Sequence, residues 1–225
     1  GPTTTSTIDS AVIANLRITD NFFGTTNGID LSLNNTVYQG IKVFLRNWPT
    51  GFSAELIPTR SLQILRNNFY NTTLPIQLGT GNSTANCIYF NDSIPMSYEI
   101  AGNTIGTATN LGINSLITGE GGWSVAGINV CNLRDLNIHN NVISNSRGDF
   151  VDSAILLNNS QFTVQDNIIG GGNGSNTIFG YGITVNGNYL GLRSYILGNL
   201  INNIFTITGQ TAITNCIGRY ALTPN

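Results

Sequence analysis

The chain has 225 residues, enough to bury the core of one domain, and 40% of them are hydrophobic. Only 9% are charged, the net charge is −2 and Lys42 is the single lysine, so the basic stripe that a nucleic-acid partner requires is missing. No apolar run has the length of a membrane span. Solubility must come from uncharged amides and hydroxyls, a composition typical of proteins that are extracellular or on a virion surface.

Residues 1–14 are expected to be a lead-in, and their opening Gly1-Pro2 looks like a scar of protease cleavage. From residue 15 onward one phrase recurs, in which an aliphatic residue precedes an asparagine by three positions and an Ile or Phe follows it by two. Successive copies start between 26 and 46 residues apart, a spacing that favours a solenoid with loops of unequal length. The six copies are Ile18/Asn21/Phe23, Ile64/Asn67/Phe69, Ile100/Asn103/Ile105, Ile138/Asn141/Ile143, Val164/Asn167/Ile169 and Ile196/Asn199/Ile201.

A second phrase, a small residue followed by aliphatic-x-aliphatic, falls between successive copies of the first. It occurs at 40–43, 87–90, 127–130, 154–157, 182–185 and 212–214, and a weaker strand pattern occurs at 29–31, 75–78 and 205–207. Alternation over three to five residues, bounded by Gly, Asn and Ser, predicts short strands. We therefore expect an all-β chain in which each turn offers two or three strands and the turns stack as parallel sheets.

The repeated asparagines have a structural role in this interpretation. At the bend between two strands, an inward asparagine can hydrogen-bond the backbone and the asparagine of the next turn, which forms a ladder. An alternative is a β-sandwich whose turns carry asparagines, but a sandwich would not reproduce one spaced triplet six times in order. The predicted ladder consists of Asn21, Asn67, Asn103, Asn141, Asn167 and Asn199.

This Asn-centred repeat resembles the right-handed parallel β-helix proteins of the pectate-lyase-like class, over roughly residues 15–216. The resemblance implies a right-handed single-stranded parallel β-helix of about six to seven coils, followed by a C-terminal tail at 217–225. The class includes polysaccharide lyases, hydrolases and esterases, and also bacteriophage tail spikes and surface adhesins. The resemblance is specific for architecture, and it implies no catalytic residue for this chain.

Catalytic candidates are few. Enzymes on this scaffold cleave glycans with carboxylates or with a calcium-assisted base, and the 11 Asp and Glu residues form no dense acidic cluster, so we expect no metal and no cofactor. Asp149 and Asp152 lie in a turn before a predicted strand, where an aspartate also serves as a turn cap. His139 and Asp166 belong to adjacent turns, although a lone exposed histidine is usually just solvated. Adjacent turns should bring together His139, Asn140, Gln165 and Asp166 as one surface patch.

Aromatic residues point to a ligand site. Trp48 and Trp123 lie in long loops that would flank one row of strands, whose outward residues are Lys42, Tyr89 and Asn129. Aromatic walls over a floor of amides and hydroxyls suit a polysaccharide or a cell-surface glycan. The alternative is that each Trp packs inward as the core of its own loop.

An outward column of apolar residues suggests a covered face. The residue that follows each ladder asparagine is Phe22, Asn68, Thr104, Val142, Ile168 or Leu200, and four of these six are apolar. A second copy of the chain, as in a homotrimer, would cover them. Bends in the coil that turn the same side chains inward are the alternative.

The three cysteines, Cys87, Cys131 and Cys216, are odd in number and match no zinc spacing. We expect them to be buried free thiols rather than a bridge.

Two functions from different classes remain. The first is a non-catalytic recognition or structural module of a tail-spike or fibre-like surface protein. The second is a polysaccharide lyase or glycoside hydrolase with a reduced active site. The missing carboxylate cluster favours the first and leaves enzymatic activity undecided.

Overall fold

The computed structural model describes residues 15–24, 37–45, 60–80, 96–107, 110–114, 125–147, 151–170, 178–179, 181–188, 193–202, 204–205 and 217–220. These residues form strands and turns, and no helix occurs among them. Accordingly, the described ranges contain no helix with the length and apolarity that a membrane crossing needs. The all-β prediction is confirmed.

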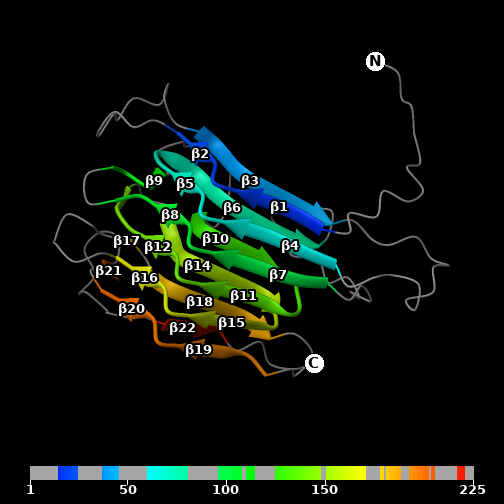
Figure 1. Ribbon diagram of the computed structural model, residues 1–225. Helices are drawn as coiled ribbons and strands as arrows, with labels where there is room; N and C mark the ends of the chain where they lie inside the picture. Colours follow the sequence, from blue (N-terminus) through cyan, green and yellow to red (C-terminus); the bar gives the residue numbers. More distant parts are fainter. Residues whose placement is uncertain are drawn as a thin grey trace, which may run out of the picture.

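Two six-stranded parallel sheets are built from alternating strands of the chain (Figure 1). The first sheet contains β1 (Asn15–Thr19), β4 (Arg60–Leu65), β7 (Met96–Ala101), β11 (Leu136–His139), β15 (Phe162–Gln165) and β19 (Tyr195–Leu197). The second sheet contains β2 (Phe22–Phe23), β5 (Asn68–Phe69), β8 (Thr104–Ile105), β12 (Val142–Ile143), β16 (Ile168–Ile169) and β20 (Leu200–Ile201).

The third sheet is also parallel. It contains β3 (Val37–Leu45), β6 (Thr72–Thr80), β9 (Ile113–Asn114), β10 (Val125–Cys131), β13 (Ser146–Arg147), β14 (Val151–Ser160), β18 (Tyr181–Asn188) and β22 (Ile217–Tyr220). A separate parallel pair joins β17 (Ile178–Phe179) to β21 (Ile204–Phe205).

The chain visits the sheets in the same order each time, from the first to the second to the third, and then begins the next strand of the first sheet. We call one such circuit a coil, and the two six-stranded sheets count six of them. Parallel strands stacked coil upon coil are consistent with a parallel β-helix, as the repeat predicts.

The six repeated asparagines lie at the bend between the first and second sheets. In each coil but the last, the backbone N–H and the Nδ2 group of the asparagine donate to Oδ1 of the asparagine in the next coil, at 2.8 to 3.1 Å. The ladder runs through Asn21, Asn67, Asn103, Asn141, Asn167 and Asn199. Its four inner members are fully buried, so these bonds satisfy polar groups that water cannot reach.

The bend also explains the residue before each ladder asparagine. That residue has φ between 53 and 64° in every coil, and the six are Asp20, Arg66, Gly102, Asn140, Asp166 and Gly198. Gly, Asn and Asp tolerate this left-handed conformation best. Five coils therefore use a residue suited to the bend, and Arg66 is the exception.

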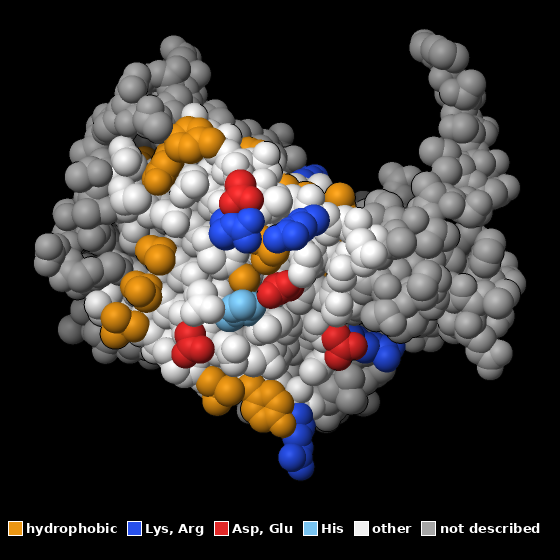
Figure 2. Space-filling view, viewed as in Figure 1, with side chains coloured by type: hydrophobic (Ala, Val, Ile, Leu, Met, Phe, Trp, Pro, Cys, Tyr) orange, Lys and Arg blue, Asp and Glu red, His pale blue; other side chains and the backbone are white. Residues whose placement is uncertain are grey.

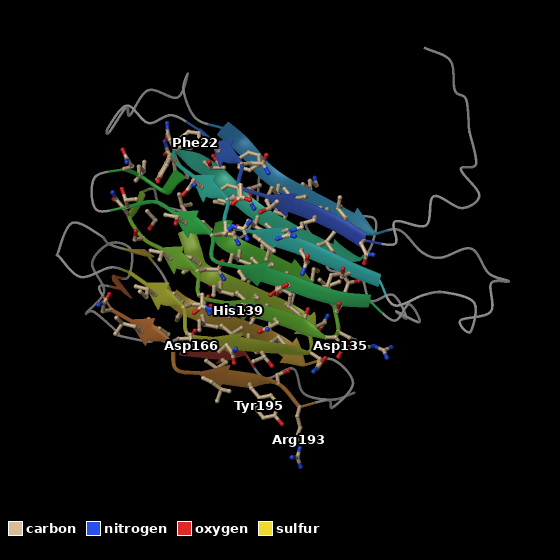
Figure 3. The ribbon with its side chains drawn as sticks, viewed as in Figure 1. Phe22, Asp135, His139, Asp166, Arg193 and Tyr195 are labelled. Atoms are coloured by element: carbon tan, nitrogen blue, oxygen red, sulfur yellow. The ribbon has the colours of Figure 1, made fainter. Side chains whose placement is uncertain are left out.

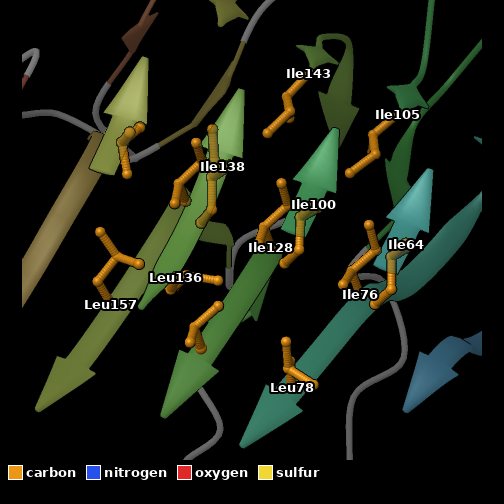
Figure 4. Close-up of a cluster of buried hydrophobic side chains, with 14 of the residues drawn as sticks. Ile64, Ile76, Leu78, Ile100, Ile105, Ile128, Leu136, Ile138, Ile143 and Leu157 are labelled. Atoms are coloured by element: carbon orange, nitrogen blue, oxygen red, sulfur yellow. The ribbon is translucent and has the colours of Figure 1, made fainter. Parts of the chain in front are cut away.

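The core lies between the sheets (Figure 4). Its largest column consists of the aliphatic residues that open each copy of the repeat, which are in register across the first sheet: Ile18, Ile64, Ile100, Ile138, Val164 and Ile196. The third sheet contributes a matching column of Ile41, Ile76, Ile128, Ile155 and Ile183. Burying these side chains coil after coil supplies the hydrophobic stabilisation of the stack.

The third sheet differs from the sequence prediction in the second coil. Gln77 of β6 is in register with Lys42 on one side and with Asn129 on the other. The strand at 75–78, expected to be a weaker third strand, therefore occupies the row in which we had placed 87–90. The position between Lys42 and Asn129 belongs to Gln77, and Tyr89 is outside the described residues.

The last coil differs as well. Strand β22 pairs with β18 through Ile217 and Ile183, so the stacked strands extend into the stretch expected to be a tail. The phrase at 212–214, expected to be the last strand of this row, lies outside the described residues.

Cys131, at the end of β10, is disulfide-bonded. The prediction of a free thiol is therefore wrong for this residue. Cys87 and Cys216 lie outside the described part of the chain.

Candidate functional site

The outer face of the first sheet carries polar side chains that lie in register on successive strands. Along β11 and β15, buried and partly exposed side chains alternate, so every second residue points outward. One outward column is Arg17, Gln63, Glu99, Asn137, Thr163 and Tyr195, and the next is Thr19, Leu65, Ala101, His139, Gln165 and Leu197. Figure 2 shows this face, with charged side chains scattered over a surface that is mostly uncharged.

Four side chains on this face form a hydrogen-bonded group, which we call the Glu99 cluster: Gln63, Glu99, His139 and Asn140. Gln63 Nε2 donates to Glu99 Oε2 at 2.7 Å, and His139 Nε2 lies 3.0 Å from Glu99 Oε1. Asn140 Nδ2 lies 3.0 Å from His139 Nδ1. Three consecutive coils contribute, because β4, β7 and β11 are neighbours in the sheet.

These contacts fix the imidazole. Because a carboxylate only accepts, Nε2 of His139 carries the proton and donates to Glu99, and Nδ1 then accepts from the Asn140 amide. The side chain of His139 is 20% exposed and that of Glu99 is 34% exposed, so both remain in contact with solvent. A carboxylate that orients an imidazole, in a pair that solvent can reach, is an arrangement suited to binding or to proton transfer.

The predicted patch of His139, Asn140, Gln165 and Asp166 is assembled in part. His139 is in register with Gln165, and the backbone N–H of Asn140 donates to the Gln165 carbonyl at 3.3 Å. Asp166 lies on the same face (Figure 3), but its carboxylate leans over Gly198 of the next coil, where an added Cβ would meet Asp166 Oδ1 at 2.5 Å. The carboxylate that contacts His139 is therefore Glu99.

Sequence reasoning did not place Glu99 and Gln63 in the site. A signal was present, because the repeat aligns Ile100 with Ile138. Glu99 precedes the first and His139 follows the second, so the two side chains are diagonal neighbours on the outer face.

A second charged group lies at the bend of the first two coils. The Arg66 guanidinium contacts both carboxylate oxygens of Asp20, at 2.8 and 2.7 Å, and also donates to the Thr19 hydroxyl. Hydrogen bonds from Arg66, and then from Thr19, lower the pKa of Asp20 from its usual 3.8 to about 2. The hydrogen bond to Asp20, and then the Asp20 charge, raises the pKa of Arg66 in turn.

Asp152, another catalytic candidate, is not brought to the Glu99 cluster. Asp152 lies in β14 of the third sheet, at a shift in register between β14 and β10, whereas His139 lies in the first sheet. Asp149 lies outside the described residues. Within the described ranges, no three His, Cys, Asp or Glu side chains are grouped so that they could hold a metal ion.

Only part of the predicted trough falls within the described chain. Lys42 is exposed and Asn129 is partly exposed on the third sheet, but Gln77, Leu156 and Thr184 of the same row are only 2 to 4% exposed. Trp48, Trp123 and Tyr89 lie outside the described residues. Of the residues predicted for the floor of the trough, Lys42 and Asn129 are therefore the two that the structure describes, and both are at least partly exposed.

The outward column of the second sheet is exposed at both ends. Phe22 is 48% exposed, Ile168 is 42% and Leu200 is 55%, so the bend does not turn these side chains inward. Leu197 and Tyr195, at 51% and 47%, extend the apolar surface onto the last strand of the first sheet. Leu65, which lies in the same outward column as Leu197, is only 8% exposed.

Comparison of the chain with protein-family models, with curated proteins and with solved structures found no match.

Proposed function

We propose that the chain is a recognition and structural module of an extracellular or virion-surface protein, tail-spike or fibre-like, that binds a glycan. The observation that carries the proposal is the outer face of the first sheet, where the uncharged polar side chains Gln63, Asn137 and Thr163 share one outward column with Glu99 over four consecutive coils, and Gln165 lies in the adjacent column. Amides and hydroxyls both donate and accept, which matches the hydroxyl groups of a sugar chain.

The finer fold is part of this proposal. Parallel stacking in one sheet order and a continuous asparagine ladder support a right-handed single-stranded parallel β-helix of the pectate-lyase-like class. That class contains surface proteins that recognise glycans as well as enzymes that degrade them.

The location has separate support. Cys131 is disulfide-bonded, and disulfides persist in oxidising environments such as the cell exterior. Low charge and many hydroxyl and amide groups agree with the same location.

Within the proposal, Trp48 and Trp123 are the walls of a trough near Lys42 and Asn129, and their rings stack on sugar rings. Loss of one ring removes on the order of 1 kcal/mol of stacking, so Trp48→Ala and Trp123→Ala should each weaken glycan binding about fivefold while the fold stays intact. The test is a binding titration with the glycan that the wild type binds best on a glycan array.

The matched control in that titration is the double variant Asp149→Asn with Asp152→Asn, which should bind as the wild type does. If both tryptophan variants unfold, the rings form loop cores and the trough does not exist.

The same proposal includes a homotrimer that covers the exposed apolar column. Ile168 and Leu200 are in register, and both are exposed. A single exposed apolar residue is common on a protein surface, whereas adjacent ones mark an interface. Ile168→Asp with Leu200→Asp should convert the trimer to a monomer in analytical ultracentrifugation. The control Asn68→Asp, in the same column, should leave the trimer intact. A wild-type chain that sediments as a monomer at all concentrations would remove this part of the proposal.

One observation favours the alternative, a polysaccharide lyase or glycoside hydrolase. Glu99 holds His139 in a single tautomer, as an acid–base pair requires. The test is incubation with bacterial, algal and plant polysaccharides, followed by assays for reducing ends and unsaturated products. Turnover that is lost in His139→Gln would replace the recognition proposal with the enzymatic one.

A further inference from the structure

The outward column of the first sheet that contains Leu65 and His139 has its smallest side chain in the third coil, at Ala101, and we call this position the low point. Leu65, Ala101 and His139 are in register on three neighbouring strands, and Gly102 follows Ala101 at the bend. Ala101 and Gly102 contribute only a methyl group and a hydrogen, between longer side chains from the coils on either side. Leu65 and Ala101 are each 8% exposed, so a small part of their apolar surface is accessible at this point.

Polar groups of known orientation surround these apolar atoms. The Glu99 cluster lies on one side, and the Arg66 guanidinium lies toward the second coil. Figure 2 shows apolar atoms between the pale-blue histidine and the basic side chains above it. We call this place, with Leu65 and Ala101 as floor and Glu99, His139 and Arg66 as rim, the Ala101 site.

The rim has unused hydrogen-bonding capacity. Glu99 accepts one bond from Gln63 and one from His139, and a carboxylate can accept about four. The Asn140 amide that caps His139 Nδ1 belongs to an exposed residue, so a ligand hydroxyl can take its place. The rim therefore offers strong acceptors to a hydroxyl-rich ligand and an apolar floor to its C–H groups.

Charge decides between neutral and acidic ligands. Arg66 donates through Nε and Nη2 to the two carboxylate oxygens of Asp20, so the negative charge of Asp20 balances the positive charge of Arg66. The Glu99 carboxylate would repel an anionic group placed over Ala101. The site thus fits an uncharged polyol better than a uronate or a sulfated sugar.

We propose that the Ala101 site binds one sugar residue of a neutral glycan, with the apolar face of the ring on Leu65 and Ala101 and its hydroxyls on Glu99 and His139. This proposal rests on the proposed glycan recognition and adds a subsite on the first sheet, on a different sheet from the trough near Lys42.

The experiment uses the full chain and a panel of neutral and acidic oligosaccharides, titrated by isothermal calorimetry. The neutral members are tetrasaccharides of glucose, galactose, mannose and N-acetylglucosamine, and the acidic members are oligogalacturonate and oligoalginate. Ala101→Leu fills the low point without removing a polar group, and Glu99→Gln removes the charge with little change in shape. Each should raise the dissociation constant of the best neutral glycan at least tenfold.

Asp135→Asn is the matched control, because it also replaces a carboxylate by an amide, at an exposed residue outside the proposed site. It should change the dissociation constant less than twofold. Melting temperatures by circular dichroism show whether each variant is folded, and if Ala101→Leu does not fold, the comparison of Glu99→Gln with Asp135→Asn decides.

The outcomes separate the two proposals. Unchanged binding in folded Ala101→Leu and Glu99→Gln would overturn the Ala101 site and leave glycan recognition standing. A preference for the acidic oligosaccharides would overturn the neutral assignment. A wild-type chain that binds no member of the panel would overturn both.

Discussion

Replacing Asn141 by alanine removes the central member of the asparagine ladder. The Oδ1 atom of Asn141 accepts from the backbone N–H and the Nδ2 group of Asn103, both at 2.9 Å. Its own Nδ2 donates to the carbonyls of Ile100 and His139 and to Asn167 Oδ1, at 2.9 to 3.0 Å. All of these bonds are lost in Asn141→Ala.

The remaining partners set the size of the effect. The Nδ2 group of Asn103 keeps the carbonyls of Ile64 and Ala101, and the His139 carbonyl keeps the Gly102 N–H. The backbone N–H of Asn103 loses the Oδ1 acceptor inside a fully buried site. One unsatisfied buried donor costs roughly 1–3 kcal/mol, and with the other lost bonds we expect a total of about 2–4 kcal/mol.

Asn21→Ala is the matched control, since it is the same substitution at the exposed end of the ladder. The backbone N–H of residue 21 still donates to Asn67 Oδ1, so no buried donor is orphaned, and we expect a loss below about 1 kcal/mol. Guanidinium unfolding followed by circular dichroism gives both free energies by linear extrapolation. Equal losses in the two variants, or a loss of only a few tenths in Asn141→Ala, would refute the ladder as a source of stability.

Three further changes test other parts of the structure. Gly102→Ala should cost about 1 kcal/mol in guanidinium unfolding, because φ is +64° while the added Cβ meets only ordinary contacts, the nearest being Arg66 Cγ at 3.4 Å; no loss would mean that the bend is not held in this conformation. Arg66→Gln should raise the pKa of Asp20 from about 2 toward 3.8 in an NMR titration. Because the folded pKa of Asp20 is lowered, the stability that the pair contributes is present above about pH 4 and is lost as the pH falls toward 2; an unchanged pKa would contradict the pairing. Deletion of 217–225 removes β22 and exposes the edge of β18, so the shortened chain should aggregate in light scattering, and a soluble monomer would count against that pairing.

The sequence predicted the first and second sheets because their spacing is rigid. The aliphatic residue, the asparagine and the second apolar residue are always three and two positions apart, since one bend of fixed geometry separates the two strands. The third sheet has no such constraint. Ile41 follows its ladder asparagine by 20 residues and Ile76 by 9, so the pattern could not decide between 75–78 and 87–90.

The candidate site was predicted less well than the fold. Register between coils placed His139 beside Gln165, but the direction of the Asp166 carboxylate depends on Gly198, whose missing side chain leaves room for it. The disulfide of Cys131 was missed because an odd number of cysteines does not reveal which of them pair. Side-chain direction and pairing of this kind depend on neighbours that are distant in sequence.

Glycan recognition without turnover is the central claim, and one measurement tests it most directly. The full chain is applied to an array of bacterial, algal and plant polysaccharides, and every polysaccharide that it binds is then incubated with the chain and assayed for reducing ends and unsaturated products. We predict saturable binding to at least one neutral polysaccharide and no product. Product formation, or the absence of binding to every polysaccharide on the array, would contradict the claim.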